Sequence, residues 1–161
     1  MQPPHCHSCP GCHMWFPNEE WQCGGCTGFT SQFTRLGGLE NFDAKFVIVT
    51  QGPIDEALAY KKRVGNTMTW YSTANSPFGD DVGAPLDGGF AVNVFLRDGD
   101  TVYRTWHTNG RGTEQLSYLF GLVDLLPYGR QEEWQDSPEG MAAVAYLQQV
   151  GQRPDHRHAL R

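Results

Sequence analysis

The sequence predicts an α/β domain with a central mixed sheet of about four strands and helices on both faces. Two observations predict this class. The continuous apolar, β-branched run 46–50 is typical of a strand that is covered on both faces, as in a parallel sheet. The Asp98-Gly99 turn between two strand-like runs indicates an antiparallel hairpin. Parallel and antiparallel strands separated by helical segments together indicate a mixed sheet between helices.

The first half of the chain is predicted to run strand, helix, strand, helix. The short aromatic segment 13–16 is interpreted as the first strand, and the helix that begins at the cysteines of segment 23–26 is expected to end at the glycine pair 37–38. After the strand 46–50, a helix is expected over 53–64, because acidic residues open this segment and basic residues close it. A β-α-β unit of this kind has a right-handed crossover, so its two strands should be parallel.

The second half is predicted to contain a long connection, a hairpin and a helix. The connection 66–89 is rich in glycine, proline, asparagine, serine and aspartate, and its residues 70–71 are the best candidates for a short strand. The hairpin strands are expected at 91–96 and 101–108. Leucine, phenylalanine and valine residues at helical spacing predict a helix over 116–123, which a proline ends.

Length and composition indicate one globular domain over residues 1–161. The apolar share of 39% is enough for a core, so global disorder is not expected. Residues 1–11 contain three prolines and are expected to be irregular. Residues 128–161 are expected to form a polar C-terminal extension of the same domain.

Charge and hydropathy narrow the range of partners. The net charge is −6 and no basic stripe follows the chain, so nucleic acid is not an expected partner. No apolar run reaches the roughly 18 residues that a membrane helix needs. The start of the sequence lacks the basic and apolar regions of a signal peptide. We therefore expect a cytoplasmic protein, and in that compartment a CxxC pair is more often catalytic or metal-binding than a structural disulfide.

All five cysteines lie in the first 26 residues of the chain. They are Cys6, Cys9, Cys12, Cys23 and Cys26. An odd number cannot pair fully within one chain, and the rest of the sequence has no cysteine. These thiols therefore belong to one local site, or to two adjacent sites, and do not hold the whole fold together.

The pair Cys23 and Cys26, separated by two glycines, is the leading candidate for chemistry. Because the N–H groups at a helix N-terminus stabilise a thiolate, this position lowers a thiol pKa. In a redox mechanism Cys23 is the nucleophile that attacks a disulfide, and Cys26, one turn inside the helix, releases the product. No organic cofactor is expected, because the glycine pairs lack a phosphate-binding pattern. Four aromatic residues can either line this site or pack in the core: Trp21, Trp70, Trp106 and His107.

The residues leave three alternatives open. Cys9 and Cys12 together with Cys23 and Cys26 form two pairs at a spacing compatible with a tetrahedral zinc site. Cys6, Cys9 and Cys12 can instead form an accessory relay that passes electrons to the second pair. The chain can also be a non-catalytic binding module. Metal content and free thiols per chain separate the zinc site from the redox site, and turnover after changing Cys9 and Cys12 to Ser tests the relay.

Six segments in one order along the chain carry a family resemblance: HMWF at 13–16, WQCGGC at 21–26, AYKKRVG at 59–65, VFLRDG at 94–99, RG at 111–112 and LPYGR at 126–130. With the order of elements, they make the chain resemble the thioredoxin fold. Within that fold the chain resembles a family of predicted dithiol-disulfide oxidoreductases long catalogued as a domain of unknown function. The resemblance implies disulfide exchange through Cys23 and Cys26, with a disulfide-containing protein or small molecule as the substrate.

Two features depart from the family pattern. Members usually have an apolar first strand where this chain has the segment 6–12, and a central strand is a poor place for its proline and glycine. We therefore expect a first strand that is short or remodelled. Thioredoxins also have a cis-proline just before the hairpin, facing the active cysteines. Pro85 is the nearest proline, but it precedes the hairpin by several residues and is not assigned that role.

Overall fold

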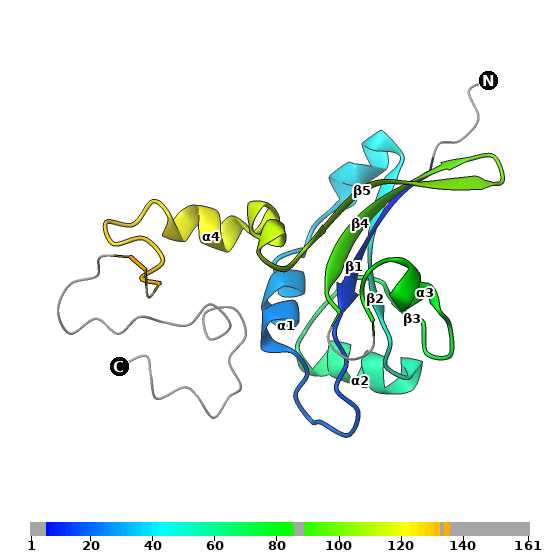
Figure 1. Ribbon diagram of the computed structural model, residues 1–161, viewed down its shortest axis with the longest axis horizontal. Helices are drawn as coiled ribbons and strands as arrows, with labels where there is room; N and C mark the ends of the chain where they lie inside the picture. The colour runs from blue at the N-terminus through cyan, green and yellow to red at the C-terminus, as the bar shows by residue number, and fades with distance from the viewer. Residues whose placement is uncertain (1–5, 86–88, 133, 136–161) are drawn as a thin grey trace.

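The computed structural model describes residues 6–85, 89–132 and 134–135. Its centre is a five-stranded sheet in the order β3-β2-β1-β4-β5 (Figure 1). The strands are β1 (Cys6–His13), β2 (Ala44–Thr50), β3 (Trp70–Ser72), β4 (Ala91–Asp98) and β5 (Thr101–Asn109). The α-helices are α1 (Gly24–Ser31), α2 (Ile54–Arg63), α3 (Phe78–Asp81) and α4 (Tyr118–Val123). The 3-10 helices are η1 (Gly37–Phe42) and η2 (Gly110–Leu116).

The directions of the strands make this sheet a mixed one. β1 is parallel to β2, and β2 is parallel to β3. β4 is antiparallel to both β1 and β5. A β-α-β unit followed by a helix and an antiparallel hairpin, with the strands ordered β2-β1-β4-β5, is the thioredoxin-like arrangement. The predicted fold class is therefore confirmed, and the additional edge strand β3 lies where a short strand was expected.

The first strand differs from the sequence prediction. β1 covers 6–13, so it occupies most of the segment 1–11 that was expected to be irregular, and it ends where a strand over 13–16 was expected to begin. The local pattern was misleading because β1 gains backbone partners on two sides, from β2 and from β4. Residues 1–5 of the predicted irregular segment lie outside the described residues.

The proline of β1 is accommodated by an interruption in one ladder. The ladder between β1 and β4 has pairs at Ser8 and at Gly11 but skips the two residues between them. Pro10, which has no N–H to donate, lies in that gap. On its other side Pro10 is level with Val47 of β2, and that parallel ladder continues without a shift. A proline is therefore tolerated in this central strand.

The remaining elements match the sequence, with shifted ends. α1 ends at Ser31, earlier than expected, and the glycine pair 37–38 opens η1 instead of closing α1. α2 is followed by Gly65, whose φ of 68° is the left-handed conformation that ends many helices. The helix expected at 116–123 is α4, which η2 precedes. Residues 136–161, most of the predicted C-terminal extension, lie outside the described residues.

Two clusters of buried side chains cover the two faces of the sheet. Ile48 belongs to the first cluster and Cys12 to the second. Cys12 is level with Val49 of β2, and successive strand residues point to opposite faces, so Cys12 lies on the face opposite to Ile48. Helix α2 contributes Tyr60 to the first cluster, and Phe78 of α3 packs against the second. Helices therefore lie on both faces, as predicted.

Helix α4 extends away from the sheet and is tied to η2 by charged side chains (Figure 1). The guanidinium of Arg111, in η2, donates two hydrogen bonds of 2.7 Å to the carboxylate of Glu132. Arg130 donates two hydrogen bonds of 2.7 Å to Asp124, at the end of α4. Bidentate pairs fix geometry as well as charge, so they hold the chain after α4 against η2. Among the described residues, no helix has the length and apolar character needed to cross a membrane.

Candidate active site

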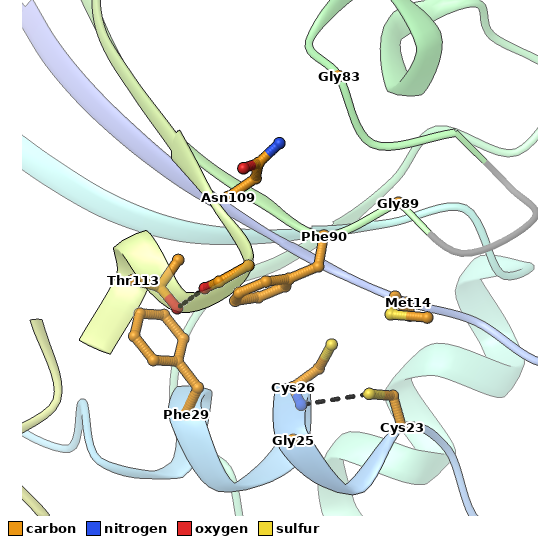
Figure 2. A pocket seen from close by; sticks show the side chains of 11 residues that line it. Met14, Cys23, Gly25, Cys26, Phe29, Gly83, Gly89, Phe90, Asn109 and Thr113 are labelled. Carbon is orange, nitrogen blue, oxygen red and sulfur yellow. Dashed lines mark hydrogen bonds between the residues drawn. The ribbon is translucent and has the colours of Figure 1, made fainter. Parts of the chain in front are cut away.

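Cys23 and Cys26 lie at the start of α1, close to the C-terminal end of β1 (Figure 2). Cys23 is the N-cap residue, and its Sγ accepts a hydrogen bond of 3.4 Å from the backbone N–H of Cys26. The N–H groups of a first helical turn have no partner within the helix, so the sulfur takes the place of the usual capping oxygen. Cys23 is half-buried and Cys26 is buried, and both thiols are free.

The two thiols have opposite pKa shifts. The side chain of Cys26 donates a hydrogen bond to the Cys23 sulfur and is the main cause that lowers the pKa of Cys23 to about 6. The backbone N–H groups of Cys26 and Gly25 add to this effect, and partial burial opposes it. The same bond to Cys23, together with burial and the neighbouring negative charge, raises the pKa of Cys26 well above its usual value. At neutral pH Cys23 is therefore a thiolate and Cys26 a thiol.

A chain of hydrogen bonds joins α1 to β1 and α2 behind the pair. The Thr27 hydroxyl donates to the backbone carbonyl of Cys23 at 2.8 Å, so the Tyr60 hydroxyl is the donor in its 2.8 Å bond with Thr27 Oγ1. Nδ1 of His13 donates to the carbonyl of Met14 at 2.8 Å, so Nε2 can only accept. Nε2 lies 3.3 Å from Thr27 Oγ1, and it shares the Thr27 hydroxyl proton with the carbonyl of Cys23. Burial lowers the pKa of His13 to about 4, so its ring is neutral. These contacts hold the backbone that carries Cys23.

The spacing of residues in the sequence does not identify the members of this hydrogen-bonded chain. His13 and Tyr60 fall in the segments 13–16 and 59–65, which carry the family resemblance, and Thr27 directly follows the CxxC motif. Those positions are the only signal that the sequence offers for them. Their shared role depends on β1, α1 and α2 meeting at one place, and that meeting is a property of the fold.

A cavity of about 470 Å³ opens beside the two thiols (Figure 2). Its apolar lining comes from Met14, Phe29 and Phe90, and the rings of Phe29 and Phe90 meet edge to face with their centroids 5.5 Å apart. Phe90 directly precedes β4, the place where thioredoxins have their cis-proline. All described peptide bonds are trans, and Pro85 is not in the lining of the cavity. The volume is in the range of small-molecule sites.

Cys12, the other cysteine whose side chain the structure describes, does not form a cluster of metal ligands with Cys23 and Cys26. Cys12 is buried on the sheet, and burial raises its pKa to about 11. Within the part of the chain that the structure describes, no three His, Cys, Asp or Glu side chains lie close enough together to hold a metal ion. Cys12, Cys23 and Cys26 therefore form no such set by themselves. The four-thiolate site with Cys9, and any role of Cys6, stay predictions.

None of the four aromatic residues that the sequence offered for this site lines the cavity. Trp21 packs against Tyr60 with ring centroids 6.4 Å apart. Trp70 is buried in the first core cluster. Trp106 and His107 lie on β5 and are exposed. Core packing was the correct alternative for Trp70.

Comparisons with known proteins identify a family and a distant structural likeness. The family described as "Bacterial protein of unknown function (DUF899)" matches residues 2–150. No curated protein matches the chain. Peroxiredoxin Q of Xanthomonas campestris is similar over 69% of this chain and 75% of its own, with 13% identity and a TM-score of 0.44. A bacterioferritin comigratory protein of Xanthomonas campestris is similar over 69% of this chain and 75% of its own, with 13% identity and a TM-score of 0.43. A likeness this distant transfers no activity.

Proposed function

This chain belongs to the bacterial DUF899 family of proteins of unknown function, and for it we propose the function of a thiol–disulfide oxidoreductase that acts through Cys23 and Cys26. The observation that carries the proposal is the asymmetry of the two thiols. One is an accessible thiolate at a helix N-terminus, and the other is a buried thiol that donates a hydrogen bond to it. This is the pairing that a nucleophile and a resolving cysteine require.

The proposed reaction has two steps. The Cys23 thiolate attacks one sulfur of a substrate disulfide, a mixed disulfide forms, and the first substrate thiolate leaves. Cys26 then loses its proton and attacks the Cys23 sulfur, which releases the second substrate thiolate and leaves a Cys23–Cys26 disulfide. The substrate gains two electrons and the protein loses two. An external dithiol reverses the protein half of the reaction and restores both thiols.

The raised pKa of Cys26 ensures that Cys23 reacts first and Cys26 second. A protonated Cys26 does not compete with Cys23 for the substrate, and its proton stabilises the Cys23 thiolate before the attack. Once Cys23 is part of a mixed disulfide, it carries no negative charge, so two of the causes that raise the pKa of Cys26 are removed. The second thiol is therefore activated only after the first has reacted.

A single domain over residues 1–161 and a cytoplasmic location belong to the same proposal. A reducing compartment favours the dithiol form in which the pair is active as a reductant. The substrate is a disulfide-containing protein or small molecule. Nucleic acid and membrane are not partners in this proposal, and its chemistry needs no organic cofactor.

The proposal is tested by trapping the mixed disulfide. With Cys26→Ser, incubation with hydroxyethyl disulfide should add the mass of one hydroxyethylthio group to the intact protein, and mapping should place it on Cys23. The matched Cys23→Ser protein should trap nothing under the same conditions. Absence of the adduct in a folded Cys26→Ser protein would contradict the proposal and favour a binding module. One tightly bound zinc per chain, with all thiols resistant to alkylation, would favour the metal site instead.

A further inference from the structure

The cavity beside the thiols has the position of a substrate pocket. Cys23 and Cys26 both belong to its lining, so a molecule inside it lies against the sulfur that attacks. Figure 2 shows the Cys26 sulfur pointing toward Phe90 and Met14 across this space. A disulfide held in the cavity would therefore have one sulfur near the Cys23 thiolate and a substituent against these two side chains.

The side chains described in the lining of this cavity are mostly apolar. Met14, Phe29 and Phe90 provide side-chain carbon and one thioether sulfur. The hydroxyl of Thr113 already donates to the carbonyl of Gly110 at 2.8 Å, so its proton is used within the protein (Figure 2). Four glycines, which have no side chain, also belong to the lining.

Charge is the second feature of the lining. Among its described residues, the two thiols are the only ionisable groups, and Asn109 is a neutral amide that Figure 2 shows turned away from the sulfurs. A carboxylate placed in this space would lose water without gaining a cation as a partner, and burial of an unpaired charge costs several kilocalories per mole in proteins. An ammonium group would have only the Cys23 thiolate as a partner, and that charge disappears when the mixed disulfide forms. An alkyl group placed there gains the hydrophobic contribution instead.

From this position and lining, we infer that the cavity selects a small organic disulfide with uncharged, apolar substituents. The inference rests on the proposed function and names the substrate class for it. One alkylthio group occupies the space between Phe90 and Met14 and leaves as a thiol after the second step. The other alkylthio group is displaced by Cys23 in the first step. Two electrons pass from the two cysteines to the substrate, as in the general reaction.

The inference is tested with three disulfides of similar size and different charge. Dipropyl disulfide is uncharged, dithiodiglycolate is anionic and cystamine is cationic. The value of kcat/KM is measured for each with the full-length protein, and each value is divided by the rate constant of dithiothreitol with the same disulfide, because charge also alters intrinsic reactivity. The normalised preference for dipropyl disulfide should be about tenfold or more, since each buried methylene contributes roughly a factor of four.

Two variants that place opposite charges in the cavity should give opposite substrate preferences. Phe90→Arg should raise the normalised rate for dithiodiglycolate relative to cystamine, and Phe90→Glu should do the reverse, each by on the order of tenfold. The two variants remove the same ring, so any general damage is common to both. Val102→Arg, on the exposed part of β5, adds the same charge far from the cavity and should leave the wild-type order unchanged.

The outcomes separate this inference from the proposed function. Equal normalised rates for the three disulfides in the wild-type protein would overturn the substrate class and leave disulfide exchange intact. Faster reduction of a protein disulfide, such as those of insulin, than of dipropyl disulfide would also overturn it. Failure to reduce any disulfide, together with no adduct on Cys26→Ser, would overturn the proposed function itself.

Discussion

This protein has two C-x-x-C segments with the same spacing, one in a strand and the other at the start of a helix. Cys9 and Cys12 are in the strand β1, whereas Cys23 caps α1 and Cys26 lies in its first turn. A strand rises roughly 3.3 Å per residue, so three positions separate Cα atoms by about 10 Å, which is beyond the reach of a disulfide. At the helix start the backbone N–H of Cys26 is 3.4 Å from the Cys23 sulfur.

The difference shows that the backbone determines what a cysteine spacing means. Cys12 is buried on a sheet, without the unpaired N–H groups of a helix start, and its pKa rises to about 11. Cys23 has those groups and a donating thiol beside it, and its pKa falls to about 6. The second segment is therefore suited to thiolate chemistry, whereas Cys12 of the first segment is suited to packing on one face of the sheet.

The largest expected effect is on turnover. Cys23→Ser should lower disulfide reduction by on the order of 10³-fold or more, because the attacking atom is lost. A Cys9→Ser/Cys12→Ser double variant should leave turnover unchanged, since no relay through the first segment is required. The measurement is the rate of reduction of hydroxyethyl disulfide with excess dithiothreitol. A large loss in the double variant would mean that the first segment takes part in electron transfer.

The next effect is on thiol ionisation. Thiolate absorbance in the ultraviolet should rise with a midpoint near pH 6, and this step should be absent from Cys23→Ser. The step should persist in Cys12→Ala, because the pKa of Cys12 is about 11 and its ionisation lies at much higher pH. A first midpoint near the ordinary thiol value in the wild-type protein would show that α1 does not stabilise a thiolate.

A third effect concerns stability at the end of β1. His13 has a pKa of about 4 in the folded protein and an ordinary pKa near 6.5 when unfolded, so the unfolded chain binds its proton first as the pH falls. The free energy of unfolding therefore has the full contribution of the neutral His13 ring above pH 6.5. It decreases by on the order of 3 kcal/mol as the pH falls toward 4. Urea unfolding at several pH values measures this loss. His13→Gln should flatten the curve in that window, and an unchanged curve would contradict the buried neutral ring.

The smallest expected effect concerns the support behind the pair. Tyr60→Phe removes the hydrogen bond to Thr27 Oγ1 and should lower the free energy of unfolding by about 1 kcal/mol. Tyr71→Phe is the matched control, because Tyr71 on β3 is half exposed. Urea midpoints of the two variants give the comparison. Equal midpoints would show that the Tyr60 hydroxyl contributes nothing to the fold.

Most of the fold was predictable because its patterns are local. The β-branched run of β2, the charge order of α2 and the Asp98-Gly99 turn each specify one element. β1 was not predictable in its position, because Pro10 and Gly11 disfavour a strand locally. Only the two neighbouring strands, which pair with it from distant parts of the chain, make it one.

The candidate site also has residues that the sequence predicts and residues that only the fold brings together. Cys23 and Cys26 follow from their spacing at the start of a predicted helix. Phe90 and the hydrogen-bonded chain of His13, Thr27 and Tyr60 come from separate elements that only the folded sheet brings together. The spacing also leaves a zinc site with Cys9 open, because two C-x-x-C pairs provide four thiolates, and that site stays a prediction.

The most direct test is to locate the disulfide that forms during turnover. The protein is reacted with one equivalent of hydroxyethyl disulfide, remaining thiols are alkylated at low pH, and peptides are mapped by mass spectrometry, with zinc measured on the same sample. A Cys23–Cys26 disulfide with Cys12 alkylated as a free thiol is the predicted result. A disulfide within the first segment, or thiols that stay protected around a bound zinc, would contradict the account.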